Sequence, residues 1–172
     1  MFATGNFTGY CADNDLHTDY EKQVVLWWWI RDNVEYAGIP QNGNSVYTAL
    51  FKNKTVCQGY SALATLFFNR AGVEGFSVIG ETSSKHACNW VHLGEDWYAF
   101  DSTNSREGLF LMGIKAEYHK KEYKYTGGEL YWGLPMTDYD YKYKKHELIG
   151  PKIKLILYQM EATDSGSILD GH

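Results

Sequence analysis

The stretch from Thr55 to Ala71 constrains the fold most, because it reads as one amphipathic helix with a cysteine in its first turn. Thr55 and Gln58 have the spacing of a capping box, which predicts Thr55 as the N-cap and Cys57 as the second helical residue. Gly72 is expected to end the helix. One face should be buried, since apolar side chains recur at helical spacing at Tyr60, Leu63, Ala64, Phe67 and Phe68.

The predicted position of Cys57 favours reactivity. Backbone N–H groups at a helix N-terminus have no partner within the helix, and the helix dipole is positive there. Both effects favour a thiolate, which is the nucleophilic form of cysteine. The alternative is a small cysteine that only packs the helix. The sequence that follows favours the first interpretation.

Residues 86–101 read as a β-hairpin, because apolar and aromatic residues fill both arms and Gly94 with Glu95 marks a turn. If those two residues form the whole turn, His86 and Asp101 are diagonal neighbours on one face, roughly 7–8 Å apart at Cβ. A three-residue turn would place them on opposite faces. Contact between the histidine and the carboxylate therefore depends on the turn.

Cys57, His86 and Asp101 are the residue types of a thiol acyl-transfer site. The cysteine attacks a carbonyl carbon, the histidine moves the proton, and the carboxylate orients the imidazole and stabilises its charged form.

Three separated segments resemble motifs of the transglutaminase-like superfamily: Val56-Cys-Gln-Gly-Tyr-Ser61, the run from His86 to Asn89, and Trp97-Tyr98 with Asp101-Ser-Thr103. The usual patterns are Gly-Val-Cys-x-Gly-Tyr-Ala, His-Ala-Trp-Asn-x-Val and Trp-Tyr-x-x-Asp-x-Thr. The resemblance covers roughly residues 19 to 104, and it is specific because the segments agree in order and spacing. There are two departures: Thr55 stands where glycine is common, and Cys88 replaces the tryptophan of the histidine motif.

The resemblance implies a compact, bacterial-type member with a papain- or transglutaminase-like core. The residues themselves predict an α+β fold in which the central helix packs on an antiparallel sheet, with a first strand over 73–80. The length of 172 residues suits one domain. We expect an irregular N-terminal extension over 1–17, either free or in part packed on the body, and the domain over 18–160, followed by a mobile tail over 161–172. Within the domain, the core is 18–104 and tyrosine-rich strands occupy 105–160, with the best late strand at 151–158.

A second helix is predicted over 18–37, where Thr18 and Glu21 form a capping box and Gly38 is a plausible stop. Its centre, residues 24–30, is apolar nearly all round and should be buried. The tryptophans at 27–29 are most simply core residues. The alternative for one of them is a substrate wall or an indole N–H donor to an oxyanion. The loop from 41 to 54 is expected to hold one short helical turn over 45–51, whose Tyr47 either packs or approaches the site.

Composition and charge exclude some classes of function. The net charge of −5 argues against nucleic-acid binding as the main task. The longest apolar run, Val24–Ile30, is far short of the roughly twenty residues of a membrane span. The three cysteines are an odd number without zinc-module spacing, so we expect no disulfide framework. The first residues lack a signal-peptide pattern, which suits a cytosolic protein or an exported one whose targeting segment has been removed. The oligomeric state stays open.

Other candidate sites are weaker. His92 lies beside the turn, roughly 13 Å from Asp101 at strand rise, and is expected to be a surface histidine. A metal site of His86, Cys88 and His92 with Cys57 would leave Asp101 unused and lacks the usual ligand pairs of zinc sites. No calcium site is evident, and we expect no cofactor.

The sequence therefore predicts an enzyme that acts on amide bonds of a peptide or protein substrate. Cys57 would form a thioester, His86 would act as base and then acid, and Asp101 would orient His86. The backbone N–H of Cys57 is the expected oxyanion donor. Water as acceptor makes a protease or amidase, which we favour, whereas a lysine amine makes a protein-crosslinking transglutaminase. The alternative of another class is a catalytically inactive binding or scaffold module.

Overall fold

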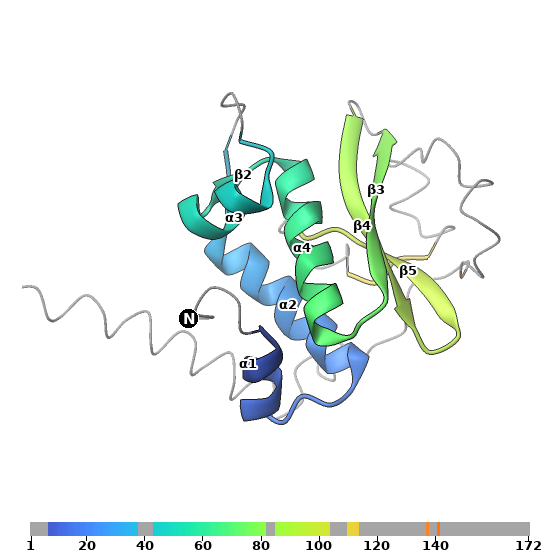
Figure 1. The fold of residues 1–172 in the computed structure, drawn as a ribbon. Helices are drawn as coiled ribbons and strands as arrows, with labels where there is room; N and C mark the ends of the chain where they lie inside the picture. Colours follow the sequence, from blue (N-terminus) through green and yellow to red (C-terminus); the bar gives the residue numbers. More distant parts are fainter. Residues whose placement is uncertain are drawn as a thin grey trace, which may run out of the picture.

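The computed structural model describes residues 7–37, 43–81, 85–103, 110–113, 137 and 141. Figure 1 shows an α+β arrangement in which α4 lies between a three-stranded antiparallel sheet and the helices α2 and α3. The elements are α1 (Phe7–Asp13), α2 (Asp19–Asn33), β1 (Glu35–Tyr36), α3 (Val46–Lys52), β2 (Lys54–Thr55), α4 (Cys57–Ala71), β3 (Gly75–Glu81), β4 (Lys85–Leu93) and β5 (Asp96–Phe100). The sheet order is β3-β4-β5, and β1 pairs with β2 in a separate parallel ladder.

Helix α4 is the centre of the fold, as predicted. All five residues of the expected apolar stripe are buried, and they belong to the main core together with residues of α2 and of the sheet. The helix ends at Gly72, whose φ of 70° is left-handed and suits glycine. A second, smaller cluster consists of Val78, Cys88, Trp90 and Trp97 from the three strands.

The predicted hairpin is confirmed, including its turn. Leu93 pairs with Asp96 across the two-residue turn, and Asn89 pairs with Phe100. Gly94 has a φ of 69°, a conformation that glycine adopts without strain. Continued by one residue beyond the last pair, this register sets Cys88 opposite Asp101, so His86 is the diagonal neighbour of Asp101.

Helix α2 begins as predicted but ends earlier. Thr18 and Glu21 form the expected capping box. The helix ends at Asn33 rather than near Ala37, because Val34 is extended and the next two residues form β1. The predicted stop at Gly38 lies outside the described residues. A two-residue strand that pairs with a distant segment leaves no periodic signal, so the sequence did not reveal it.

The N-terminal segment differs from the irregular chain that was predicted. Residues 7–13 form α1, and Cys11 and Leu16 are buried in the main core. The backbone N–H of Leu16 donates to the carbonyl oxygen of Cys11 at 2.8 Å, which closes the end of the helix. At least this part of the expected extension is therefore integral to the core.

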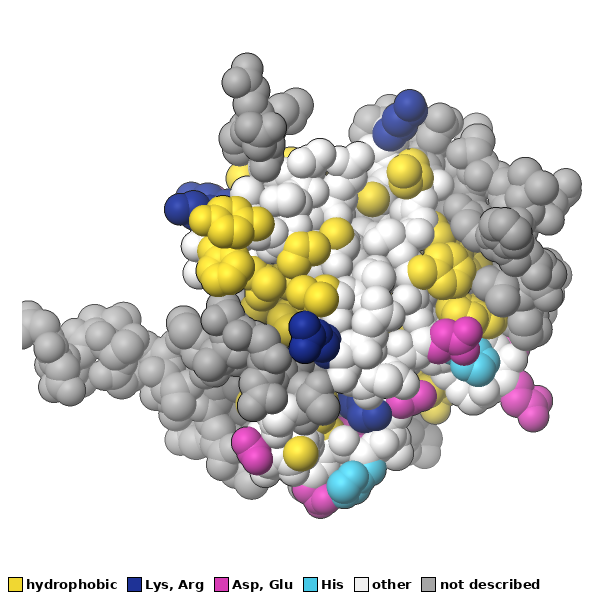
Figure 2. Space-filling model, viewed as in Figure 1, with side chains coloured by type: hydrophobic (Ala, Val, Ile, Leu, Met, Phe, Trp, Pro, Cys, Tyr) yellow, Lys and Arg dark blue, Asp and Glu magenta, His cyan; other side chains and the backbone are white. Residues whose placement is uncertain are grey.

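Helix α3 lies at the predicted short helical segment over 45–51, displaced by one residue to Val46–Lys52. Ser45 caps it through a reciprocal box with Thr48. Figure 2 shows hydrophobic side chains gathered over α3 and the adjoining part of α4. Tyr47 and Phe51, whose rings lie 5.0 Å apart, are both more than half exposed in this region.

Most of the C-terminal prediction lies outside the described residues. This holds for the strand at 151–158, the tail at 161–172 and nearly all of the tyrosine-rich region. In the parts that are described, Met112 forms a bridge with Ala99, and the N–H of Tyr141 donates to Leu111 at 2.9 Å. No described helix is both long and apolar enough to cross a membrane.

Candidate active site

Cys57 is the first residue of α4, whereas it was predicted to be the second. The N-cap is Val56, which has no side chain that can cap, so the predicted capping box of Thr55 and Gln58 is wrong. Thr55 instead donates its hydroxyl to the carbonyl oxygen of Gly43 at 2.6 Å. That acceptor is twelve residues away in the chain, which is why local spacing did not reveal it.

His86 and Asp101 are in contact. The Nε2 atom of His86 lies 2.9 Å from Oδ2 of Asp101, and the carboxylate is fully buried. Its other oxygen, Oδ1, accepts from the backbone N–H of Thr103 at 3.0 Å. The indole N–H of Trp27 donates to the backbone carbonyl of Asp101 at 3.3 Å. Asp101 is therefore held at three atoms, while the imidazole side chain keeps 16% of its surface exposed.

The sulfur of Cys57 forms a hydrogen bond with His86. This bond lowers the pKa of Cys57, and backbone N–H groups of Ala87 and Gln58 lower it further, whereas burial opposes the shift. For His86, burial alone would lower the pKa, but hydrogen bonds to Asp101 and Cys57 outweigh it and raise the pKa to about 9. Both shifts favour a thiolate and an imidazolium over the two neutral groups.

Tyr36 belongs to this site, although sequence reasoning missed it. Its phenol oxygen lies within hydrogen-bonding reach of the backbone N–H of Cys57. Burial raises the pKa of Tyr36, and the nearby Cys57 sulfur adds to the shift, so the phenol is protonated at neutral pH. The parallel pairing of Tyr36 with Thr55 places it there, and its ring stacks on Tyr60 at 6.2 Å. The signal was hidden because the predicted helix ran through residue 36.

Polar contacts fix β4 against α4 near the site. Asn89 is fully buried, and its Nδ2 donates to the carbonyl oxygen of Ser61 and to Oγ1 of Thr65, both at 2.9 Å. The hydroxyl of Ser61 donates back to the carbonyl oxygen of Cys88 at 2.7 Å. These bonds set the separation between the helix that carries Cys57 and the strand that carries His86.

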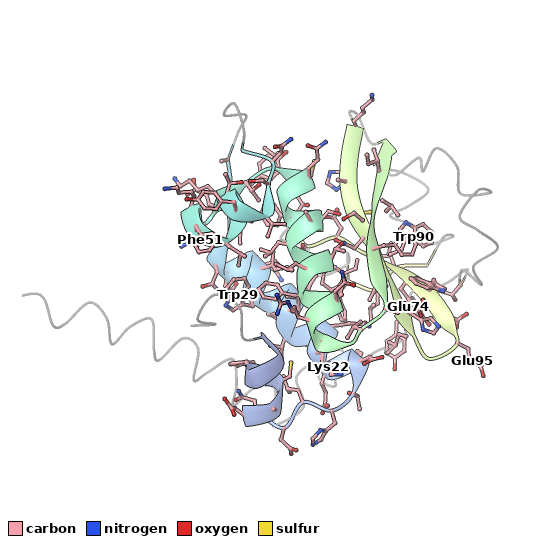
Figure 3. The ribbon with its side chains drawn as sticks, in the orientation of Figure 1. Lys22, Trp29, Phe51, Glu74, Trp90 and Glu95 are labelled. Atoms are coloured by element: carbon pink, nitrogen blue, oxygen red, sulfur yellow. The ribbon has the colours of Figure 1, made fainter. Side chains whose placement is uncertain are left out.

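The weaker candidates lie elsewhere or serve packing. His92 sits at the turn end of the hairpin, where its Nδ1 is 3.5 Å from Oε2 of Glu74 and its ring packs on Trp97. Figure 3 labels Glu74 and Glu95 at that end, remote from the start of α4. Cys88 is buried in the smaller cluster. Within the described ranges, no three His, Cys, Asp or Glu side chains are grouped as metal ligands would be.

None of the three cysteines forms a disulfide. Of the three tryptophans expected in the core, Trp27 and Trp29 are buried, whereas Trp28 is only partly buried. Because Trp27 donates its N–H to Asp101, that indole is engaged at the carboxylate side of the site.

Comparison with known proteins gives four likenesses of different weight. The sequence model of the transglutaminase-like superfamily matches residues 10–102. Kyphoscoliosis peptidase from Homo sapiens is 29% identical over an alignment of 107 residues, and the match covers 52% of this chain and 16% of that protein. The chain thus spans about a sixth of that relative.

Two solved structures are similar. One, described as a TGase, has a TM-score of 0.50 at 18% identity. The match covers 58% of this chain and 30% of the TGase chain. It supports the fold. The other is from Cytophaga hutchinsonii and is classed provisionally as a cysteine protease. It has a TM-score of 0.45 at 24% identity, and the match covers 49% of this chain and 32% of that chain.

Proposed function

The chain belongs to the transglutaminase-like superfamily, and from this premise we propose that it is a thiol acyl-transfer enzyme acting on amide bonds of peptides or proteins. Cys57 is the proposed nucleophile, His86 the general base and acid, and Asp101 the residue that orients His86. The observation that supports this most is the series of contacts from the Cys57 sulfur to His86 and from His86 to the buried carboxylate of Asp101.

In the proposed first step, the thiolate of Cys57 attacks the carbonyl carbon of the amide. The carbonyl oxygen becomes an oxyanion that replaces the Tyr36 oxygen as acceptor of the backbone N–H of Cys57, and the phenol O–H of Tyr36 donates to the same oxyanion. The C–N bond then breaks as the imidazolium of His86 gives its proton to the leaving amine. The products of this step are a free amine, a thioester on Cys57 and a neutral His86.

In the proposed second step, neutral His86 takes a proton from the acceptor as the acceptor attacks the thioester carbonyl. The C–S bond breaks, Cys57 leaves as a thiolate, and His86 returns to the imidazolium form. With water as acceptor the product is a carboxylic acid, and with a lysine amine it is a new amide. We favour water, because the curated relative is named a peptidase; the solved structure named a TGase supports transamidation as the second candidate.

Assays with one protein substrate separate these outcomes. Labelled casein is incubated with the protein, with and without a fluorescent primary amine, and Cys57→Ala serves as the control. We expect labelled fragments that depend on Cys57. Incorporation of the amine without fragments would favour the transglutaminase. If neither occurs and Cys57 is also no more reactive than an ordinary thiol, the proposal fails and an inactive binding module is favoured.

A further inference from the structure

The 43–44 segment holds the first turn of α4 from outside the helix. The carbonyl oxygen of Gly43 accepts from the hydroxyl of Thr55 at 2.6 Å and from the backbone N–H of Val56 at 3.2 Å. Asn44 donates its Nδ2 to Oε1 of Gln58 at 2.8 Å. These bonds reach the two residues before Cys57 and the residue after it.

The side chain of Thr55 is enclosed by neighbouring residues, and its hydroxyl donates to the carbonyl oxygen of Gly43. The residue is fully buried, and its backbone carbonyl accepts from the N–H of Ala37 at 3.0 Å. A Cβ added to Gly59 would lie 1.8 Å from Oγ1 of Thr55, so the helix needs glycine at position 59. Oγ1 of Thr48 lies 3.4 Å away on another side. The Thr55 side chain therefore fills the space between α3, Gly43 and the first turn of α4.

The hydroxyl of Thr55 is turned toward Gly43, and no side chain caps the first turn of α4. A threonine at this point in the chain commonly accepts from an N–H of the first turn, here that of Gln58. In the structure Val56 is the N-cap without a side-chain bond, and the N–H of Gln58 is directed at the Cys57 sulfur. The N–H of Gln58 is therefore not capped by Thr55, and it contributes to the lowered pKa of Cys57.

We propose that Thr55 is a positioning residue for Cys57, whose hydroxyl bond to Gly43 fixes the start of α4 against His86 and Tyr36. This proposal rests on the role proposed for Cys57. The proposed effect is alignment, because the bond holds the backbone two residues before Cys57. Misplacement of a reacting group by about 1 Å can cost about 100-fold in rate.

The test compares Thr55→Val, which removes the hydroxyl but keeps the shape, with Thr55→Ser, which keeps the hydroxyl. The measurement is the rate of alkylation of Cys57 by iodoacetamide across the pH range, resolved by residue with mass spectrometry. For Thr55→Val we expect an alkylation rate at pH 6 that is about tenfold lower than in the wild type. The increase of this rate with pH should also begin at a higher pH than in the wild type. Thr55→Ser should restore most of the wild-type profile.

Thr18→Val is the matched control, because it removes the N-cap hydroxyl of α2 at the far end of α4. It should lower the melting temperature without changing the Cys57 profile. If Thr55→Val does not fold, Asn44→Ala removes the exposed contact to Gln58 and should shift the profile in the same direction. If Cys57 is activated in the wild type and neither Thr55→Val nor Asn44→Ala alters its profile, this proposal alone is overturned. A wild-type Cys57 that titrates as an ordinary thiol would overturn both proposals.

Discussion

At the residue scale, the candidate site pairs a partly exposed nucleophile with a fully buried carboxylate. Cys57 is partly exposed and Asp101 is fully buried, with His86 between them. Because Asp101 is bonded at both carboxylate oxygens, it can hold the imidazole in one orientation. The division suits a reaction in which the sulfur meets substrate and the carboxylate never does.

The pH dependence of activity follows from the two pKa shifts. The active form needs a Cys57 thiolate and a His86 imidazolium, so kcat/KM should rise with pH through the lowered pKa of Cys57. It should fall again as His86 loses its proton near its pKa of about 9. Measurement of kcat/KM from pH 5 to 10 checks this bell shape. A profile that rises steadily to pH 10 would contradict the proposed use of an imidazolium as the acid.

Replacement of Tyr36 by phenylalanine tests the proposed oxyanion donor. Loss of one such donor commonly costs about 100- to 1,000-fold in kcat, and a contribution near the lower end is expected here because Tyr36 is half exposed. KM should change little, since the bond strengthens as charge develops on the oxygen. Alkylation of Cys57 is the control, because that reaction forms no oxyanion and should keep its wild-type rate. A loss seen equally in both reactions would instead indicate displacement of Cys57.

At the element scale, the site depends on how α4 meets β4. Asn89 forms the buried bonds between them, and the apolar stripe of α4 supplies the packing. Each element contributes one reacting group at its first residues: Cys57 opens α4, and His86 is the second residue of β4. A small change in their separation should therefore affect chemistry more than it affects the fold.

Asn89→Ala should lower the free energy of unfolding by about 2 kcal/mol, because buried polar partners on α4 lose their donor. It should also slow alkylation of Cys57 at low pH, since β4 is less firmly held. Urea denaturation and the alkylation rate give the two readouts. Asn33→Ala is a suitable comparison. It also removes a hydrogen bond from a side-chain amide to a backbone carbonyl, but this bond lies within α2. Equal effects of both variants on Cys57 would contradict the role given to Asn89.

The sequence predicted those elements whose signals are local. The hairpin register followed from its turn residues and apolar arms, and the capping box of Thr18 followed from spacing alone. The prediction of a capping box at Thr55 was wrong because the N-cap is Val56 and the Thr55 hydroxyl is turned toward a distant acceptor, the carbonyl oxygen of Gly43. Tyr36 was hidden because pairing of β1 with β2 is a tertiary contact. Local pattern therefore located the proposed reacting residues, but not the contacts that align them.

At the scale of the whole molecule, the candidate site lies where the helical layer meets the sheet. Cys57 comes from α4, His86 and Asp101 come from the hairpin, and Trp27 from α2 donates to the backbone carbonyl of Asp101. The superfamily match ends at residue 102, directly after Asp101. The chain spans 16% of kyphoscoliosis peptidase.

The central claim is that Cys57 and His86 act as a pair, and the pH dependence of Cys57 alkylation in wild type and His86→Ala tests it most directly. Iodoacetamide labelling is followed at Cys57 by residue-resolved mass spectrometry, with Cys11 and Cys88 as buried internal references. We predict fast labelling well below pH 8 in wild type and ordinary thiol behaviour in the variant. Labelling that is slow in wild type, or unchanged by loss of His86, would contradict the account.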